Sequence, residues 1–247
     1  MDICDQEEPK NKIKLEGFGK PIDVNIPFIR QGVKIKLRQI FQQSRATLEA
    51  ILSDPSLLKK YNYDQQLLKD ICQRNPNYET DFPGAQSVSF HFHHADDLQF
   101  NQTLICEKTD GVRFFLLDVE LIYNKQGAEA EGEATCRVYF TVDRKYEIRQ
   151  VLVLNSEKYL GQAGYDAPFS QASLTDFRII SLFDGELAQD FKAEREFEEL
   201  PNYLVFDALV VNGENVMHMH FRERLLRANE YILDRHTVYQ LRRLALQ

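Results

Sequence analysis

The sequence of 247 residues has no apolar run that approaches the ~20 residues of a membrane-spanning helix. Its first 30 residues carry charges and prolines without an apolar centre, so no signal peptide is expected. The four cysteines are widely spaced and form no C-x-x-C pair, which argues against structural zinc and favours reduced thiols in an intracellular protein. We therefore expect a protein without a membrane contact.

Positive charge is also in short supply. The chain has 30 Lys and Arg against 38 Asp and Glu, which gives a formal net charge of −8. A protein that binds polyanions without specificity is normally basic, so the balance argues against that class. It leaves room for an enzyme whose positive charge is gathered in one cleft.

The spacing of apolar residues predicts that the first ~75 residues are mainly helical. Two helices are expected, one over the apolar positions 33, 37, 40 and 41 and a second over positions 48, 51 and 52. Asp64 is typical of the N-cap of a further short helix that uses Leu67, Leu68 and Ile71.

From residue 87 onward the pattern changes to that of strands. Residues 114–123 have one apolar face throughout, and the other face changes from phenylalanine and leucine to Asp118 and Glu120, which predicts a strand that is half exposed at that end. A hairpin is expected over 138–151 with its turn at 143–146, further strands over 179–187 and 203–211, and a helix around 221–232.

The segment KTDGVR at residues 108–113 carries the strongest chemical signal. A lysine nucleophile must lose its proton, and a neighbouring cation such as Arg113 lowers the pKa of such an amine. Gly111 permits a tight turn or a close approach to a ligand, and Arg113 offers a planar fork to ribose or phosphate oxygens. Taken alone, the segment also fits a plain surface turn.

Two later segments follow in a fixed order. The first is LFDGEL at 182–187 and the second is YLVFDAL at 203–209. Each has a simpler interpretation: Asp184-Gly185 fits a hairpin turn, and 203–209 fits a buried strand that ends in an aspartate.

Taken together, the three segments resemble the motifs of the covalent nucleotidyltransferases, the superfamily of mRNA capping enzymes and polynucleotide ligases. In this superfamily a lysine attacks the α-phosphate of a nucleoside triphosphate. Two more segments, PGAQSVS at 83–89 and DRK at 143–145, resemble cellular capping enzymes rather than DNA ligases. Residues 83–236 therefore resemble an mRNA guanylyltransferase throughout.

The resemblance implies an α+β fold of the ligase-like or ATP-grasp type, in which antiparallel sheets surround a nucleotide cleft behind a helical N-terminal part. We expect a flexible N-terminus at 1–20 and one nucleotidyltransferase domain at 21–247. The family's later lysine-x-lysine motif and its C-terminal OB domain are not visible, and no lysine follows Lys192. We expect a C-terminally incomplete domain that, alone, turns over GTP poorly.

Site residues follow from the same resemblance. Lys108 is the expected nucleophile, and Tyr203 is the expected aromatic that stacks on guanine, with Phe206 as the alternate and core packing as the rival role for both. The expected GTP-binding residues are Glu107, Asp110, Arg113, Arg144, Glu186, Tyr203, Phe206 and Asp207, and the expected metal ligands are Asp184 and Glu186.

The implied reaction is transfer of GMP from GTP, through a lysyl–GMP intermediate, to the diphosphate 5′ end of nascent mRNA in the nucleus. Mg²⁺ or Mn²⁺ is the implied cofactor, and RNA polymerase II, through its C-terminal domain, and a separate RNA triphosphatase are the implied partners. An ATP-dependent polynucleotide ligase and a non-catalytic capping-enzyme-like fragment are the alternatives.

Histidines and arginines near the end of the chain receive structural interpretations. His218 and His220 alternate as on one strand face, and no further Cys or His stands at zinc-ligand spacing, so a solvated strand is expected. Arg222, Arg224 and Arg227 are expected on the polar face of a helix rather than at RNA.

Overall fold

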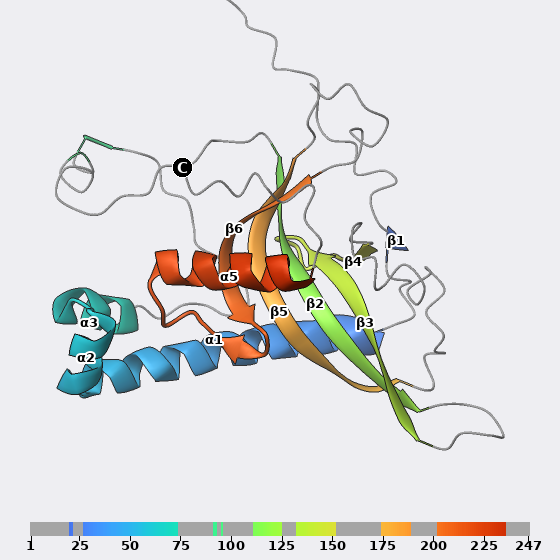
Figure 1. Ribbon diagram of the computed structural model, residues 1–247, viewed down its shortest axis with the longest axis horizontal. Coiled ribbons are helices and arrows are strands. Elements are labelled where there is room, and N and C mark those ends of the chain that lie inside the picture. Colours follow the sequence, from blue (N-terminus) through green and yellow to red (C-terminus); the bar gives the residue numbers. More distant parts are fainter. Residues whose placement is uncertain are drawn as a thin grey trace, which may run out of the picture.

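The computed structural model describes residues 20–21, 27–73, 91–92, 95, 111–124, 132–151, 174–188 and 202–235. Within these residues the chain forms a sheet with the strand order β1-β4-β3-β2-β5-β6-β7, in which every neighbouring pair is antiparallel. Figure 1 shows this twisted sheet with α1 below it and α5 across its front. The mixed helix and antiparallel-sheet class expected from the sequence is confirmed.

Each strand region predicted from the apolar pattern contains a strand, although β3 and β5 begin five residues earlier than expected and β1 and β7 were not predicted. The strands are β1 (Lys20–Pro21), β2 (Val112–Asn124), β3 (Glu133–Val142), β4 (Ile148–Val151), β5 (Leu174–Ala188), β6 (Asn202–Val211) and β7 (Glu214–Asn215). The predicted turn of the β3–β4 hairpin is confirmed, because the Tyr146 amide donates to the Asp143 carbonyl at 3.0 Å. Asp143 also accepts from the amides of Lys145 and Glu147, which fixes this turn.

Helix α1 (Pro27–Ser53) covers one face of the sheet. It buries Ile29, Val33, Leu37 and Phe41, which recur every four residues, against the β2 side chains of alternate positions from Phe115 to Leu121. The prediction of two helices over this region was wrong. The interior of α1 after Gly32 contains neither glycine nor proline, so nothing in its backbone ends the helix before Ser53.

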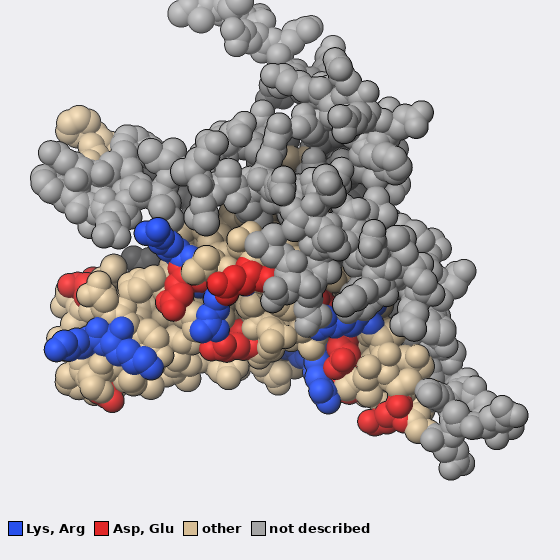
Figure 2. All heavy atoms as spheres, viewed as in Figure 1, with Lys and Arg blue, Asp and Glu red and all other residues tan. Residues whose placement is uncertain are grey.

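Two short helices extend the N-terminal part at the far end of α1. Helix α2 (Pro55–Tyr61) begins after the N-cap Asp54, and α3 (Gln65–Gln73) begins after Asp64, whose carboxylate accepts from the Leu67 amide at 2.7 Å. The predicted N-cap at Asp64 is therefore confirmed. Figure 2 shows positive charge over α2, which carries Lys59 and Lys60 in its last turn.

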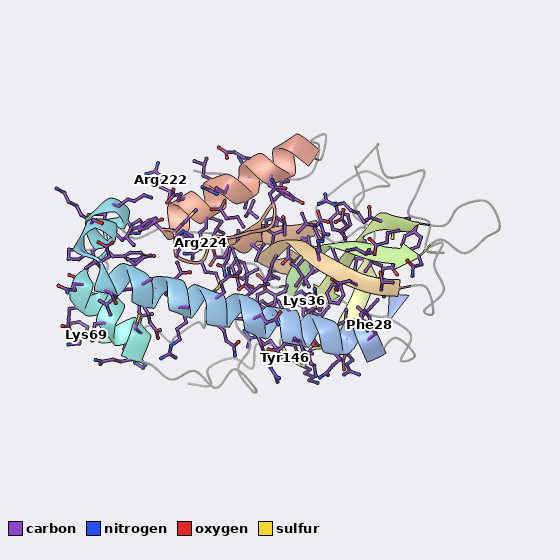
Figure 3. All side chains as sticks on the ribbon, turned by 90° about the horizontal axis from the view of Figure 1, so that it is seen from below. Phe28, Lys36, Lys69, Tyr146, Arg222 and Arg224 are labelled. Carbon is purple, nitrogen blue, oxygen red and sulfur yellow. The ribbon has the colours of Figure 1, made fainter. Side chains whose placement is uncertain are left out.

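Helix α5 (Phe221–Arg235) covers the opposite face of the sheet. Ala228, Tyr231 and Ile232 pack against Phe183 of β5 and Val205 and Ala208 of β6, in a second apolar cluster that is separate from the one under α1. Figure 3 shows the strands lying between α1 and α5. No helix within the described residues is long and apolar enough to cross a membrane.

Asp118 is buried beneath α5, although the sequence pattern predicted a half-exposed strand face at this position. The Tyr231 hydroxyl donates to Asp118 Oδ2 at 2.6 Å, and Arg137 Nη1 lies 3.5 Å from the same oxygen. Burial, followed by the charge of Asp118, raises the pKa of Tyr231, so its phenol keeps the proton that it donates. The sheet therefore tolerates a charged residue here because α5 supplies a donor.

This contact gives a stability prediction. Tyr231→Phe should lower the free energy of unfolding by about 1.5–3 kcal/mol, because it removes a hydrogen bond to a buried charged group. Urea denaturation measures the change. In the double variant Tyr231→Phe/Asp118→Asn the two losses should not add, since the partners share one bond; additive losses would show that the bond contributes nothing.

Candidate active site

Glycines of two motifs permit close packing where β2, β5 and β6 lie side by side. A Cβ on Gly111 would lie 2.3 Å from the Leu187 carbonyl oxygen, and a Cβ on Gly185 would lie 2.4 Å from that of Leu204. Asp184-Gly185 is not a hairpin turn, because both residues lie inside β5. The simpler interpretation of this motif was therefore wrong, and its glycine serves close strand packing.

A hydrogen bond connects the KTDGVR segment to the DGE segment. The Gly111 amide donates to Glu186 Oε1 at 2.9 Å, across 75 positions of sequence. Arg113 and Glu186 are also directly paired in the β2–β5 ladder, so their side chains share a face of the sheet. The end of the proposed nucleophile segment is thus attached to the strand that carries Asp184 and Glu186.

Arg113 forms a two-pronged ion pair with Asp184. Arg113 Nε donates to Asp184 Oδ1 at 2.8 Å, and Nη2 donates to Oδ2. The Asp184 side chain is fully buried, and burial raises its pKa against the opposing effect of Arg113. The hydrogen bond to Asp184 raises the pKa of Arg113, so the guanidinium remains charged.

Phe206 completes this group of side chains. A register shift between Asp184 and Gly185 in the β5–β6 ladder leaves Phe206 without a partner residue in β5. The Arg113 guanidinium carbon lies 5.3 Å from the centre of the Phe206 ring, which is within range of a cation–π contact. Arg113 is therefore held at its edge by Asp184 and lies over an aromatic ring.

Asp207 lies directly opposite Asp184 in the same ladder and binds a different arginine. Arg224 of α5 donates from Nε to Asp207 Oδ1 at 2.8 Å and from Nη2 to Oδ2 at 2.9 Å. The prediction that Arg224 lies on a polar helix face was wrong, because its side chain is only 18% exposed. The sequence signal was a cation in the first turn of a helix, where the helix dipole disfavours it.

Tyr203 lies on the other face of the sheet. Its ladder partner is Leu187, the neighbour of Glu186, so its side chain points away from the face of Arg113 and Glu186. Its hydroxyl lies 2.8 Å from the Phe114 carbonyl oxygen and 3.1 Å from that of Phe183. Its ring lies over Gly185, where a Cβ would be 2.6 Å from Tyr203 Cζ. The guanine-stacking role of Tyr203 stays a prediction.

Arg144 approaches the site from the β3–β4 turn. Its side chain is exposed, and its charge is near enough to lower the pKa of Asp184, although burial outweighs this effect. The predicted residues Arg113, Arg144, Asp184, Glu186, Phe206 and Asp207 thus gather around β2, β5 and β6. Glu107, Lys108 and Asp110 lie outside the described residues, immediately before Gly111.

The described side chains do not fit a protein-held Mg²⁺ at Asp184. Both oxygens of this carboxylate accept from Arg113, and a cation bound there would have to displace the guanidinium. Within the described residues no three His, Cys, Asp or Glu side chains form a metal-binding group.

His218 and His220 lie in the turn region between β7 and α5, so the strand predicted for them was wrong. The His218 ring packs edge-on against Tyr61 at 5.5 Å, and the His220 ring lies 5.1 Å from that of Tyr63. The Tyr63 hydroxyl also donates to the His218 carbonyl oxygen. These contacts attach α2 and α3 to the segment that leads into α5.

Known proteins give the family of this chain. The family model of the mRNA capping enzyme catalytic domain matches residues 49–244. Similar relatives are the proteins named mRNA-capping enzyme subunit alpha of Candida glabrata, Saccharomyces cerevisiae and Neurospora crassa. In that order, they are 29%, 28% and 29% identical to this chain. The matched regions cover 69%, 64% and 54% of this chain, and 35%, 32% and 28% of the relatives' own lengths. The chain thus spans about a third of the length of these relatives. Because the family model covers most of its residues, the chain belongs to the mRNA capping enzyme catalytic-domain family.

Proposed function

We propose that this chain is the nucleotide-binding part of an mRNA guanylyltransferase that forms a covalent GMP intermediate on Lys108. The observation that carries the proposal is the hydrogen bond from the Gly111 amide to Glu186, together with the Arg113–Asp184 pair. These contacts join the segment that contains Lys108 to the DGE strand. Family membership supports the same activity.

The proposed reaction has two steps. The neutral Lys108 amine attacks the α-phosphorus of GTP and the new P–N bond forms. Pyrophosphate leaves with the electrons of the broken P–O bond, and the nitrogen gives up one proton to solvent. The terminal phosphate oxygen of a diphosphate RNA 5′ end then attacks the same phosphorus and releases the lysine. Positioning and charge stabilisation are the main contributions of the protein in phosphoryl transfer.

Arg113 is the residue with the clearest proposed task. Asp184 binds the Arg113 guanidinium at its edge and Phe206 packs against its face. These contacts hold the guanidinium in one orientation before the nucleotide binds. In the proposal it meets ribose or phosphate oxygens, with Arg144 as a second, exposed cation and Glu186 at the ribose. Mg²⁺ or Mn²⁺ belongs to the proposal as an ion that accompanies GTP, because Asp184 is occupied by Arg113.

The proposed setting follows from the same function. The substrate is the diphosphate 5′ end of nascent mRNA, the place is the nucleus, and the partners are RNA polymerase II and an RNA triphosphatase. A ligase-like or ATP-grasp arrangement of the domain is part of this proposal.

Covalent labelling tests the proposal. The chain, in excess over α-labelled GTP or α-labelled ATP, is incubated with a divalent ion, and label that stays on the denatured protein is measured. A GTP-dependent adduct supports the guanylyltransferase, and an ATP-dependent adduct supports a polynucleotide ligase instead. No adduct with either nucleotide would favour a non-catalytic protein.

The stacking ring gives a second prediction. We propose that guanine stacks on Phe206, the alternate predicted from sequence, because this ring lies at Arg113 whereas Tyr203 points to the other face. Phe206→Ala should weaken GTP binding by about 1–3 kcal/mol, the usual contribution of a base on an aromatic ring. Fluorescence titration with a GTP analogue measures this change.

Tyr203→Phe is the matched control for that experiment. It keeps a ring but loses a hydrogen bond to backbone, so it should cost about 0.5–1.5 kcal/mol in stability and leave GTP affinity unchanged. If Tyr203→Ala, but not Phe206→Ala, weakens GTP binding in folded protein, the stacking ring is Tyr203.

A further inference from the structure

Two buried aspartates face each other across neighbouring strands. Asp184 of β5 and Asp207 of β6 form a direct ladder pair, and their exposed fractions are 0% and 7%. Like charges directly opposite each other destabilise a sheet. Each aspartate avoids this cost by binding its own arginine, Arg113 for Asp184 and Arg224 for Asp207.

Arg224 is placed where a cation is otherwise unfavourable. It lies in the first turn of α5, near the positive end of the helix dipole. Three hydrogen bonds offset this unfavourable position. Arg224 donates twice to the Asp207 carboxylate, and its Nη1 donates to the Met219 carbonyl oxygen at 2.7 Å. Figure 3 shows Arg224 on the side of α5 that faces the strands, with Arg222 on the other side.

Without Arg224, the Asp207 carboxylate would stay buried beside Asp184 with its ion-pair partner gone. Another cation within electrostatic range is Arg113, whose charge already interacts with that of Asp207. An unpaired buried carboxylate is costly and draws a neighbouring cation towards it. Arg113 would then be shared between two aspartates and would leave its position over Phe206.

We propose that Arg224 is a positioning residue of the nucleotide site: it neutralises Asp207 so that Arg113 stays with Asp184 and over Phe206. Its consequence for GTP binding rests on the proposed function, whereas the coupling between Arg224 and Arg113 does not. The two facing aspartates thus belong to two separate ion pairs, and α5 supplies the arginine of the second.

The binding experiment uses the full chain and three variants. Arg224→Gln should weaken binding of a fluorescent GTP analogue by roughly tenfold or more. Both oxygens of Asp207 accept from Arg224, so in this proposal Asp207 does not contact GTP, contrary to the sequence expectation. Arg224→Gln/Asp207→Asn removes the unpaired carboxylate as well and should bind within about threefold of the wild type. Arg222→Gln, an exposed arginine two residues earlier, is the matched control and should change nothing. A double variant that folds but binds as weakly as Arg224→Gln would overturn the proposal.

A second readout needs no nucleotide. The Arg113 Nε–H resonance in a ¹H–¹⁵N spectrum reports its hydrogen bond to Asp184. It should shift in Arg224→Gln, return towards its original position in the double variant, and stay unchanged in Arg222→Gln. If the wild type binds no GTP, the proposed function fails and this resonance still decides the inference. If Arg224→Gln does not fold, the double variant decides alone, since an altered Arg113 resonance in it contradicts the proposal.

Discussion

Replacing Lys108 with alanine should abolish the protein–GMP adduct altogether. The adduct needs a P–N bond, and no other atom of the side chain at position 108 can form it. Removal of a covalent nucleophile in other enzymes reduces the rate by as much as roughly 10⁶. Lys108→Arg should fail equally, because a guanidinium does not lose its proton near neutral pH.

The controls separate chemistry from binding. Lys69→Ala removes an exposed lysine of α3 and should leave the yield of labelled protein unchanged. Lys108→Ala should still bind a GTP analogue, since Arg113 and Phe206 are intact. Label that stays on the Lys108→Ala protein after denaturation would assign the nucleophile to another residue.

Sequence periodicity predicted most of the described fold because the strands and helices bury simple faces. The alternate positions of β2 from Phe115 to Leu121 and the four-residue repeat of α1 are both visible in the sequence and both lie in the core. The continuity of α1 was missed because its apolar stripe has a gap, where Ser44 occupies a buried position. Periodicity reports which face is buried and is less informative about where a helix ends.

The motifs predicted which residues lie near one another, but they did not predict which side chains are in contact. Motif order placed Arg113, Glu186 and Asp207 together, and ladder pairing brings them near. The register shift in the β5–β6 ladder was invisible in the sequence, although it brings Asp207 directly opposite Asp184. That Phe206 lies at Arg113 is likewise a fact of the folded sheet.

Arg224 was missed for a similar reason. Its partner Asp207 is 17 positions away on another element, and an arginine among charged helix residues normally faces solvent. Only its place in the first turn distinguished it. Buried ion pairs between elements depend on tertiary geometry, which no local pattern encodes.

Breaking the Arg113–Asp184 pair should have the largest effect on stability among the described contacts. Arg113→Ala leaves a fully buried carboxylate beside Asp207, and removal of one partner from a buried ion pair costs about 3–5 kcal/mol. Urea denaturation monitored by circular dichroism measures this loss. The same variant should lose GTP binding, because the preorganised guanidinium is gone.

The double variant Arg113→Met/Asp184→Leu distinguishes the two consequences. Replacing a buried ion pair by apolar side chains of similar volume is often neutral for stability, so most of the lost free energy of unfolding should return. GTP binding should not return, since no cation remains over Phe206. If stability and binding recover together, Arg113 is structural and the proposed nucleotide contact is wrong; if neither single nor double variant changes binding, GTP occupies another part of the protein. We expect the double variant to regain stability and to remain unable to bind GTP. That outcome would show that the ion pair is present for function rather than for stability.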